Sequence, residues 1–136
     1  MKKFCYPAIF HPEEVGYSVD VPDFEKVNFG CSTCGDTFEE ACDMAFDAIG
    51  LCIDTILEDG TALPEATKPE LLSKSDGDFV VPIVVDMQKY YQSVSTKSVK
   101  KTLSIPEWLS NMAEKENISL SKLLQKALAA ELGVEL

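Results

Sequence analysis

Apolar residues in the last third of the chain follow a two-residue period and then a helical one. Leu103 and Ile105 alternate with polar residues, which is typical of a strand because successive strand side chains face opposite sides. Pro106 suits the first turn of a helix, where its missing N–H is no loss. Two short helical patterns follow, and Gly133 suits the end of the second. The pattern therefore predicts a strand and two helices within residues 98–136.

A strand and two short helices are too small to bury their own apolar side chains. We therefore expect a second copy of the chain, with the two strands paired antiparallel and four helices closing over a shared core. The expected core positions recur on one side of each element. They are Leu103, Ile105, Trp108, Leu109, Leu120, Leu123, Leu124 and Leu128.

The polar side of the predicted strand suits nucleic acid. A two-stranded ribbon fits the major groove of DNA, where lysine, threonine and serine side chains can hydrogen-bond base edges. We expect phosphate contacts from nearby lysines and from the start of the second helix, where free N–H groups attract anions. The expected base-reading residues are Lys100, Thr102 and Ser104, and the expected phosphate contacts are Lys97, Lys101, Ser119 and Lys122.

This order of elements resembles the ribbon-helix-helix DNA-binding fold over residues 99–133. The resemblance is carried by the strand alternation, by Ile-Pro-Glu-x-Leu ending at Leu109, and by Ser-Leu-Ser starting at Ser119. Lys101 departs from it, because the family usually has an aliphatic residue at this inward position. The alternative is a strand-helix-helix tail that dimerises without contacting DNA.

The front two-thirds of the chain predicts a small sheet with one long helix. Residues 3–10 are rich in β-forming side chains and residues 15–21 alternate, so we expect a hairpin. Residues 79–86 predict a third strand, and Pro82 favours a place at the sheet edge or a bulge. Between them, apolar residues recur every three or four positions over residues 38–58, which predicts a helix.

Two overlapping capping boxes mark the start of this helix. They pair Asp36 with Glu39 and Thr37 with Glu40. Together, the patterns predict an α+β protein: a small antiparallel sheet of three or more strands with the long helix on one face, followed by a dimeric ribbon-helix-helix tail.

Charge is divided unevenly along the chain, whose formal net charge is −11. Residues 1–96 hold 6 Lys and 18 Asp or Glu, a net charge of −12, whereas residues 97–136 hold 6 Lys and 5 Asp or Glu, a net charge of +1. We expect a front domain over residues 1–91, a hinge over 92–97 and the tail over 98–136. An acidic body repels phosphate and attracts basic proteins, although acidity can also serve solubility alone.

The front domain resembles the antitoxins of the HicB type. The resemblance is carried by the alternating strand ending at Asp20, by Gly-Asp-Thr-x-Glu-Glu-Ala ending at Ala41, and by Val-Val-Asp ending at Asp86 with Tyr90 after it. The loop before Gly35 is longer than usual. In this family the front domain has a partial ribonuclease H-like fold.

The HicB resemblance implies a cytoplasmic antitoxin that covers the RNA-binding face and catalytic histidine of a small basic ribonuclease toxin, HicA. It also implies that the tail binds operator DNA, as a dimer or a tetramer, so that the pair represses its own promoter. The residues expected to contact the toxin are Asp20, Asp23 and Glu25. The alternatives are an acidic dimeric adaptor or orphan regulator without a toxin partner, and a metal-dependent nuclease.

Catalytic and metal-binding chemistry finds little support in the sequence. Cys31 and Cys34 have the spacing of half a zinc site, but two further ligands are not apparent, so we expect two loop thiols. We expect His11 to be an exposed turn histidine beside Pro12. Asp20 and Asp86 end strands, but catalytic metal needs several converging carboxylates. We expect no enzyme activity and no cofactor.

The export and membrane signals are also weak. The chain has no run of about 18 apolar residues that would span a membrane. Pro7 and His11 interrupt the apolar segment that a secretory signal would need after the first lysines. We therefore expect the five cysteines to be reduced thiols in the cytoplasm, with Cys42 and Cys52 packed in the core.

Overall fold

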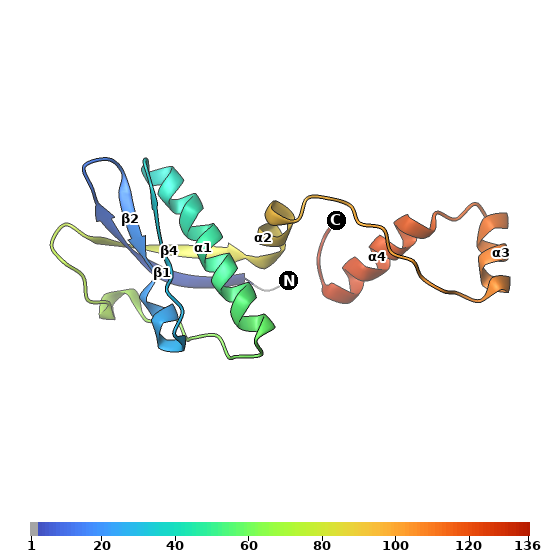
Figure 1. The fold of residues 1–136 in the computed structure, drawn as a ribbon, viewed down its shortest axis with the longest axis horizontal. Helices are drawn as coiled ribbons and strands as arrows, with labels where there is room; N and C mark the ends of the chain where they lie inside the picture. Colours follow the sequence, from blue (N-terminus) through green and yellow to red (C-terminus); the bar gives the residue numbers. More distant parts are fainter. Residues whose placement is uncertain (1–2) are drawn as a thin grey trace. The chain divides into compact units, whose positions relative to one another are not determined.

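The computed structural model describes residues 3–136, which form two compact units (Figure 1). The front unit runs to Ser93, and the C-terminal unit begins at Val94. This boundary falls inside the last turn of helix α2 (Met87–Val94), within the stretch where the sequence predicts a hinge.

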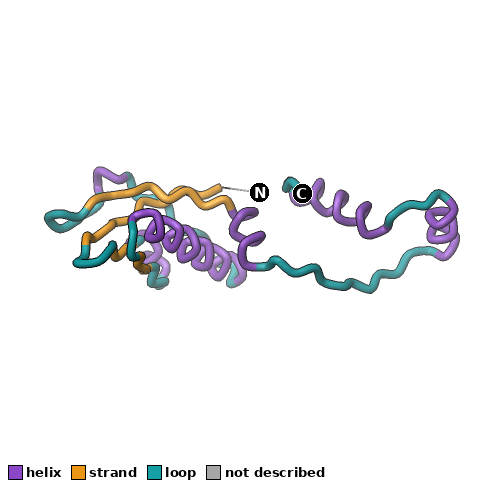
Figure 2. Tube along the Cα trace, turned by 90° about the horizontal axis from the view of Figure 1, so that it is seen from above, coloured by secondary structure: helices purple, strands orange, loops and turns teal. Residues whose placement is uncertain are grey.

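The front unit is built on a four-stranded antiparallel sheet in the order β3-β2-β1-β4. The strands are β1 (Lys3–Pro12), β2 (Tyr17–Asp20), β3 (Ser32–Gly35) and β4 (Phe79–Asp86). Helix α1 (Phe38–Glu58) covers one face of this sheet, so that strands and helix form two layers (Figure 2). The expected small antiparallel sheet with one long helix is confirmed.

Helix α1 begins and packs as its sequence predicts. The Oγ1 atom of Thr37 accepts a hydrogen bond from the backbone N–H of Glu40 at 3.1 Å, which caps the first turn. Gly50 lets the ring of Tyr90 approach, because a Cβ atom there would lie 2.2 Å from Tyr90 Cδ1. The residues of α1 that are buried against the sheet are Ala41, Ala45, Ile49, Cys52, Ile53 and Ile56.

Strand β4 lies at the edge of the sheet, as Pro82 predicts. It pairs with β1 from Phe10↔Phe79 to Lys3↔Asp86, and Pro82 stands opposite Pro7. A proline at an edge costs less than one in a central strand, because only one side of the strand carries ladder hydrogen bonds.

The hairpin region differs from the sequence expectation in three places. Strand β2 is shorter than predicted, and Val15 is 71% exposed, because Gly16 turns the chain with φ +73°. The predicted loop after Pro22 contains a 3-10 helix, η1 (Pro22–Val27), and strand β3. Strand β1 extends past His11, so the expectation of a turn histidine is wrong.

The connection from α1 to β4 contains one further 3-10 helix, η2 (Pro69–Leu71). The buried hydroxyl of Tyr6 donates a hydrogen bond to the carbonyl oxygen of Pro64 at 2.6 Å. This bond ties the connection to the central strand β1.

The C-terminal unit contains two helices, α3 (Glu107–Lys115) and α4 (Leu120–Leu132). Ser119 caps α4 through its hydroxyl, and Gly133 closes it with φ +67°. Residues 95–106 form no strand in this single chain. A strand needs a neighbour for its backbone hydrogen bonds, so the ribbon stays a prediction about two chains.

Candidate partner-binding surfaces

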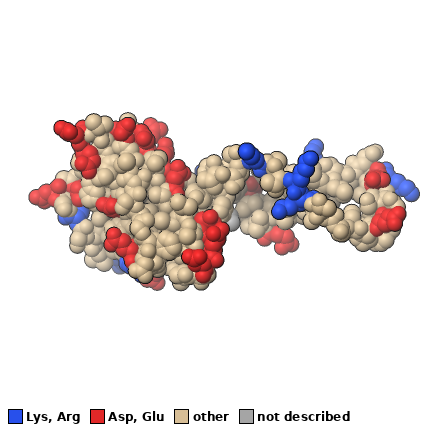
Figure 3. All heavy atoms as spheres, viewed as in Figure 1, with Lys and Arg blue, Asp and Glu red and all other residues tan. Residues whose placement is uncertain are grey.

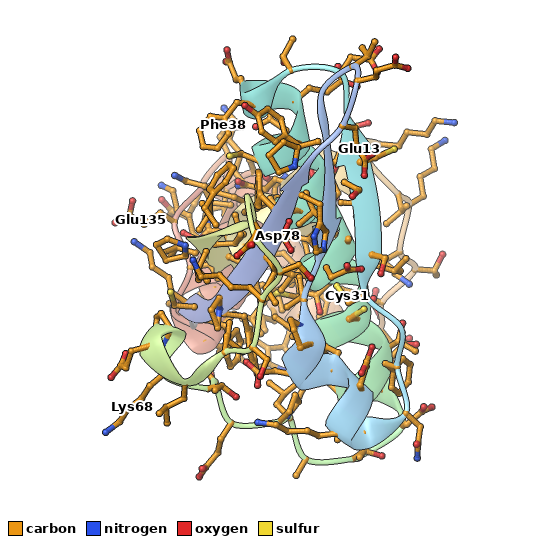
Figure 4. The ribbon with its side chains drawn as sticks, turned by 90° about the vertical axis from the view of Figure 1, so that its left-hand side faces the viewer. Glu13, Cys31, Phe38, Lys68, Asp78 and Glu135 are labelled. Atoms are coloured by element: carbon orange, nitrogen blue, oxygen red, sulfur yellow. The ribbon has the colours of Figure 1, made fainter. Side chains whose placement is uncertain are left out.

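His11 is held between two carboxylates on the face of the sheet that α1 does not cover. With the ring protonated, Nε2–H donates to Asp20 Oδ2 at 2.7 Å and Nδ1–H donates to Asp78 Oδ2 at 2.6 Å. Ser32 Oγ donates to the other oxygen of Asp20 at 2.6 Å. The cluster joins β1, β2, β3 and the turn before β4, and Figure 4 looks onto it with Asp78 labelled.

The cluster favours its charged form. Burial opposes protonation of His11, but the hydrogen bonds and charges of Asp20 and Asp78 outweigh it and raise the pKa of the imidazole above its ordinary value. The hydrogen bond from Ser32 is the main cause that lowers the pKa of Asp20, and His11 adds to it against the effect of burial. Because both ring nitrogens are engaged, His11 has the geometry of a structural ion cluster rather than of a general base.

Asp23 faces the interior, contrary to the expectation that it contacts a partner. It is 1% exposed, and it accepts hydrogen bonds from the backbone N–H and the hydroxyl of Thr67, while Lys26 Nζ lies 2.8 Å from it. Burial alone would raise the pKa of this carboxyl, but Lys26 and Thr67 lower it. Asp23 therefore holds η1 to the connection after α1. Asp20 and Glu25 remain accessible.

Cys31 and Cys34, which the sequence places three residues apart, differ in their exposure. Cys31 is buried, and a hydrogen bond with the Cys52 thiol of α1, together with burial, raises its pKa. Cys34 is exposed on β3. Within residues 3–136, no three His, Cys, Asp or Glu side chains gather in a way that could hold a metal ion.

The candidate nuclease pair is also separated by the strand register. Asp20 stands opposite Ile9, whereas Asp86 stands opposite Lys3, at the other end of β1. These two positions are six residue steps apart along β1, or roughly 20 Å. The two carboxylates therefore cannot share one metal ion.

On the face of the front unit seen in Figure 3, most of the charged side chains are carboxylates. Most of the lysine seen in the same view lies over the C-terminal unit. The uneven charge of the sequence is thus also an uneven charge of the two units.

The expected core of the tail is uncovered in the single chain. Its exposure ranges from 37% at Leu124 to 64% at Leu103 and Trp108. The two helices and the preceding segment enclose a groove of about 410 Å³, which is lined by Ile105, Leu109, Met112, Ala113, Glu116, Ile118, Leu120 and Leu123. An apolar surface of this extent marks an interaction site.

The residues that the sequence predicts to contact DNA are exposed in the same unit. Lys100, Thr102 and Ser104 are exposed on the segment without a strand, as are Lys97 and Lys101. Ser119 accepts a hydrogen bond from the backbone N–H of Lys122 at 3.5 Å, at the start of α4. The single chain thus places Ser119 and Lys122 together at the start of α4. It forms no ribbon from residues 97–104.

The fold and these surfaces describe an acidic binding protein of two units, one folded around a sheet and one with an uncovered apolar face. Helices long and apolar enough to cross a membrane are not found in the described part of the chain. The chain belongs to the HicB-like antitoxins of bacterial toxin–antitoxin systems, whose family model matches residues 6–130.

The chain is also similar to individual proteins and solved structures. The chain is 33% identical over 107 residues to a 14.9 kDa protein of the rep-hol intergenic region of Haemophilus phage HP1 (strain HP1c1), covering 76% of this chain and 74% of the phage protein. It resembles a chain of a toxin–antitoxin complex from Streptococcus pneumoniae with a TM-score of 0.58 and 26% identity, covering 96% of this chain and 99% of that one. A chain of the HicA3–HicB3 toxin–antitoxin complex shares the fold, with a TM-score of 0.50 and 21% identity over 61% of this chain and 99% of that one.

Proposed function

We propose that this chain neutralises a HicA-type ribonuclease toxin by covering its active site with the acidic front unit. The proposal rests on membership of the HicB-like antitoxins and on the likeness to chains solved in toxin–antitoxin complexes. The observation that carries it is the charge of the front part of the chain, −12 over residues 1–96. A protein that binds RNA presents a basic face, and an acidic surface meets such a face faster and in a defined orientation.

The second part of the proposal is a dimer formed through the C-terminal unit. Fully burying one leucine side chain contributes about 1.5–3 kcal/mol, and eight expected core residues stand uncovered here. A second copy would cover them and would supply the partner strand that residues 98–105 lack. The first copy would do the same for the second, as a symmetric interface requires.

The third part is operator binding by the paired strands. Once the strands pair, Lys100, Thr102 and Ser104 of each chain would share one face, opposite Leu103 and Ile105. Such a ribbon would enter the major groove, while lysines and the start of α4 would contact phosphates.

Co-expression with the neighbouring gene tests the first part. We expect the toxin, active alone, to lose its RNA cleavage and its growth arrest when this chain is present, and the two proteins to purify as one complex. Growth arrest that this chain does not relieve would overturn the proposal. If the chain bound operator DNA without any toxin partner, the orphan regulator would be the better account.

A further inference from the structure

The outer face of α1, turned away from the sheet, combines carboxylates with two large aliphatic side chains. Met44 is 41% exposed and Leu51 is 58% exposed, although the core side of the same helix is fully buried. Positions three and four apart lie on one side of a helix. The side chains along this line, which we call the α1 outer face, are Glu40, Met44, Asp47, Leu51 and Glu58.

Beyond its first turn, where Glu39 and Glu40 suit the helix dipole, the charge of α1 is unfavourable for the helix itself. Its 21 residues include six Asp or Glu and no Lys or Arg. Asp43 and Asp47 are like charges at the i,i+4 spacing, as are Asp54 and Glu58, and such pairs destabilise a helix. Glu58 also lies at the last turn, where the helix dipole favours a cation. A helix face that served solubility alone could relieve this repulsion with lysines four residues away.

The repulsion is not relieved by neighbouring elements. The ion pairs found among residues 3–136 join His11, Asp20, Asp23, Lys26 and Asp78, and none reaches a carboxylate of α1. Asp54, beside the α1 outer face, accepts a hydrogen bond from the Tyr91 hydroxyl at 2.6 Å, which adds no positive charge. Figure 3 shows carboxylates along the course of α1 at the surface.

We propose that the α1 outer face is the docking surface for the toxin. An apolar patch of the toxin would rest on Met44 and Leu51, and lysine or arginine side chains around that patch would pair with the carboxylates on either side. This inference rests on the proposed function and gives it a place on the molecule.

The charge on this face selects the occupant. A second copy of the chain would bring its own three carboxylates of this face against Glu40, Asp47 and Glu58, and nucleic acid would bring phosphates, so both are repelled. A basic protein surface supplies the cations that α1 lacks. The aliphatic pair adds a desolvated centre, where interface residues contribute most to affinity.

Two paired substitutions separate the apolar and the charged parts of the surface. Met44→Gln with Leu51→Gln removes the aliphatic centre without changing the charge, and Glu40→Gln with Asp47→Asn removes two charges without adding bulk. Glu70→Gln with Leu71→Gln is the matched control, because both residues are exposed on η2, outside the α1 outer face. Circular dichroism of each variant is measured to check that the fold is kept.

Binding is measured against the HicA-type toxin encoded beside this chain's gene, with its catalytic histidine replaced. We expect the aliphatic variant to bind at least 10-fold more weakly and the charge variant to associate several-fold more slowly, with a smaller dependence on salt. We expect the control to bind within twofold of the wild type.

Three other results would contradict either the α1 outer face or the proposed function. If the wild type binds the toxin and both α1 variants bind equally well, the α1 outer face is wrong while the proposed function stands. If the wild type forms no complex, the proposed function fails and this inference fails with it. If an α1 variant changes the mass of the chain by itself, the face joins copies of this chain and does not receive a toxin.

Discussion

Asp78 contacts the ring of His11 at 2.6 Å, although 67 residues separate them in the sequence. The contact closes the turn before β4 onto β1, and Asp20 completes it from β2 at 2.7 Å. One histidine ring therefore joins the β1–β2 hairpin to a turn far away in the sequence, so part of the stability of the front unit depends on the protonation of this side chain.

The first prediction concerns this pH dependence. The pKa of His11 is raised in the folded chain, so its contribution to stability is complete below the unfolded value of 6.5 and is lost as pH rises through the folded value. We expect His11→Gln to lower the free energy of unfolding by about 1 kcal/mol at pH 6 and by less at pH 9. Urea unfolding at both pH values measures it. If His11→Gln lowered the free energy of unfolding equally at pH 6 and pH 9, the stabilising effect would not come from a protonated His11 between Asp20 and Asp78.

The second prediction concerns the buried carboxylate of Asp23. Asp23→Ala removes the acceptor of the Thr67 N–H and hydroxyl and the negative charge beside Lys26, so we expect the free energy of unfolding to fall by about 2–3 kcal/mol. The pKa of Asp23 is lowered, so its contribution is present above the unfolded pKa and is lost as pH falls through the folded one. The exposed neighbour is the control: Glu25→Ala should change stability by less than about 0.5 kcal/mol.

The third prediction concerns the contact between α1 and α2. Gly50→Ala places a methyl group 2.2 Å from Tyr90 Cδ1, so the ring must move, and we expect a loss of about 1–3 kcal/mol in unfolding free energy. Gly30→Ala provides the comparison, since no atom lies within 4 Å of its added Cβ. Thermal unfolding of the two variants should rank them clearly, and equal stability would mean that Tyr90 is not packed there.

The fourth prediction uses Trp108, the single tryptophan of the chain. It is 64% exposed in one copy, and the proposed dimer would bury it. We expect its fluorescence to shift to shorter wavelength as protein concentration rises, and Leu123→Glu to abolish the shift and halve the mass in solution. Emission that stays at long wavelength at every concentration would argue against a shared core at Trp108.

The fifth prediction concerns operator binding. Lys100→Ala with Thr102→Ala should weaken binding to the promoter upstream of this gene by about 10–100-fold in a gel-shift assay, since each base contact contributes about 1–3 kcal/mol of discrimination. Lys100 adds charge as well, so the dependence of affinity on salt should also decrease. Lys115→Ala, at the end of α3, should change affinity little. Operator binding that survives the double substitution would remove the ribbon assignment.

Local patterns were enough for the longest elements. Apolar spacing predicts α1, and Thr37 caps its start as the sequence indicates. The run ending at Asp86 predicts β4, with Pro82 at an edge. These elements are predictable because each satisfies its backbone within itself or along one long strand pair, so the period of its apolar residues is set by the face it buries.

Short elements and polar clusters were not predictable. Strand β3 carries small residues without alternation, and its register with β2, such as Val19↔Thr33, holds it as a strand. The sequence predicts a turn at His11, but β1 continues through it to Pro12. It also predicts an exposed Asp23, but Thr67 packs against this carboxylate and hydrogen-bonds it. The conformation or burial of each residue depends on contacts with other segments of the chain, and a local sequence pattern does not indicate those contacts.

The amino-acid sequence by itself determined that an acidic sheet-and-helix unit is followed by a tail whose apolar residues need a partner. Charge and hydrophobic period are properties of the residues themselves and can be read directly from the sequence. The tertiary structure alone decided which carboxylates face outward and which bind within the fold. Asp23 and Asp47 are both ordinary acids in the sequence, but a backbone N–H, a hydroxyl and a lysine contact the carboxylate of Asp23 in the fold. That difference arises from packing across long sequence distances, where the free energy of burying a charge is offset by its new partners.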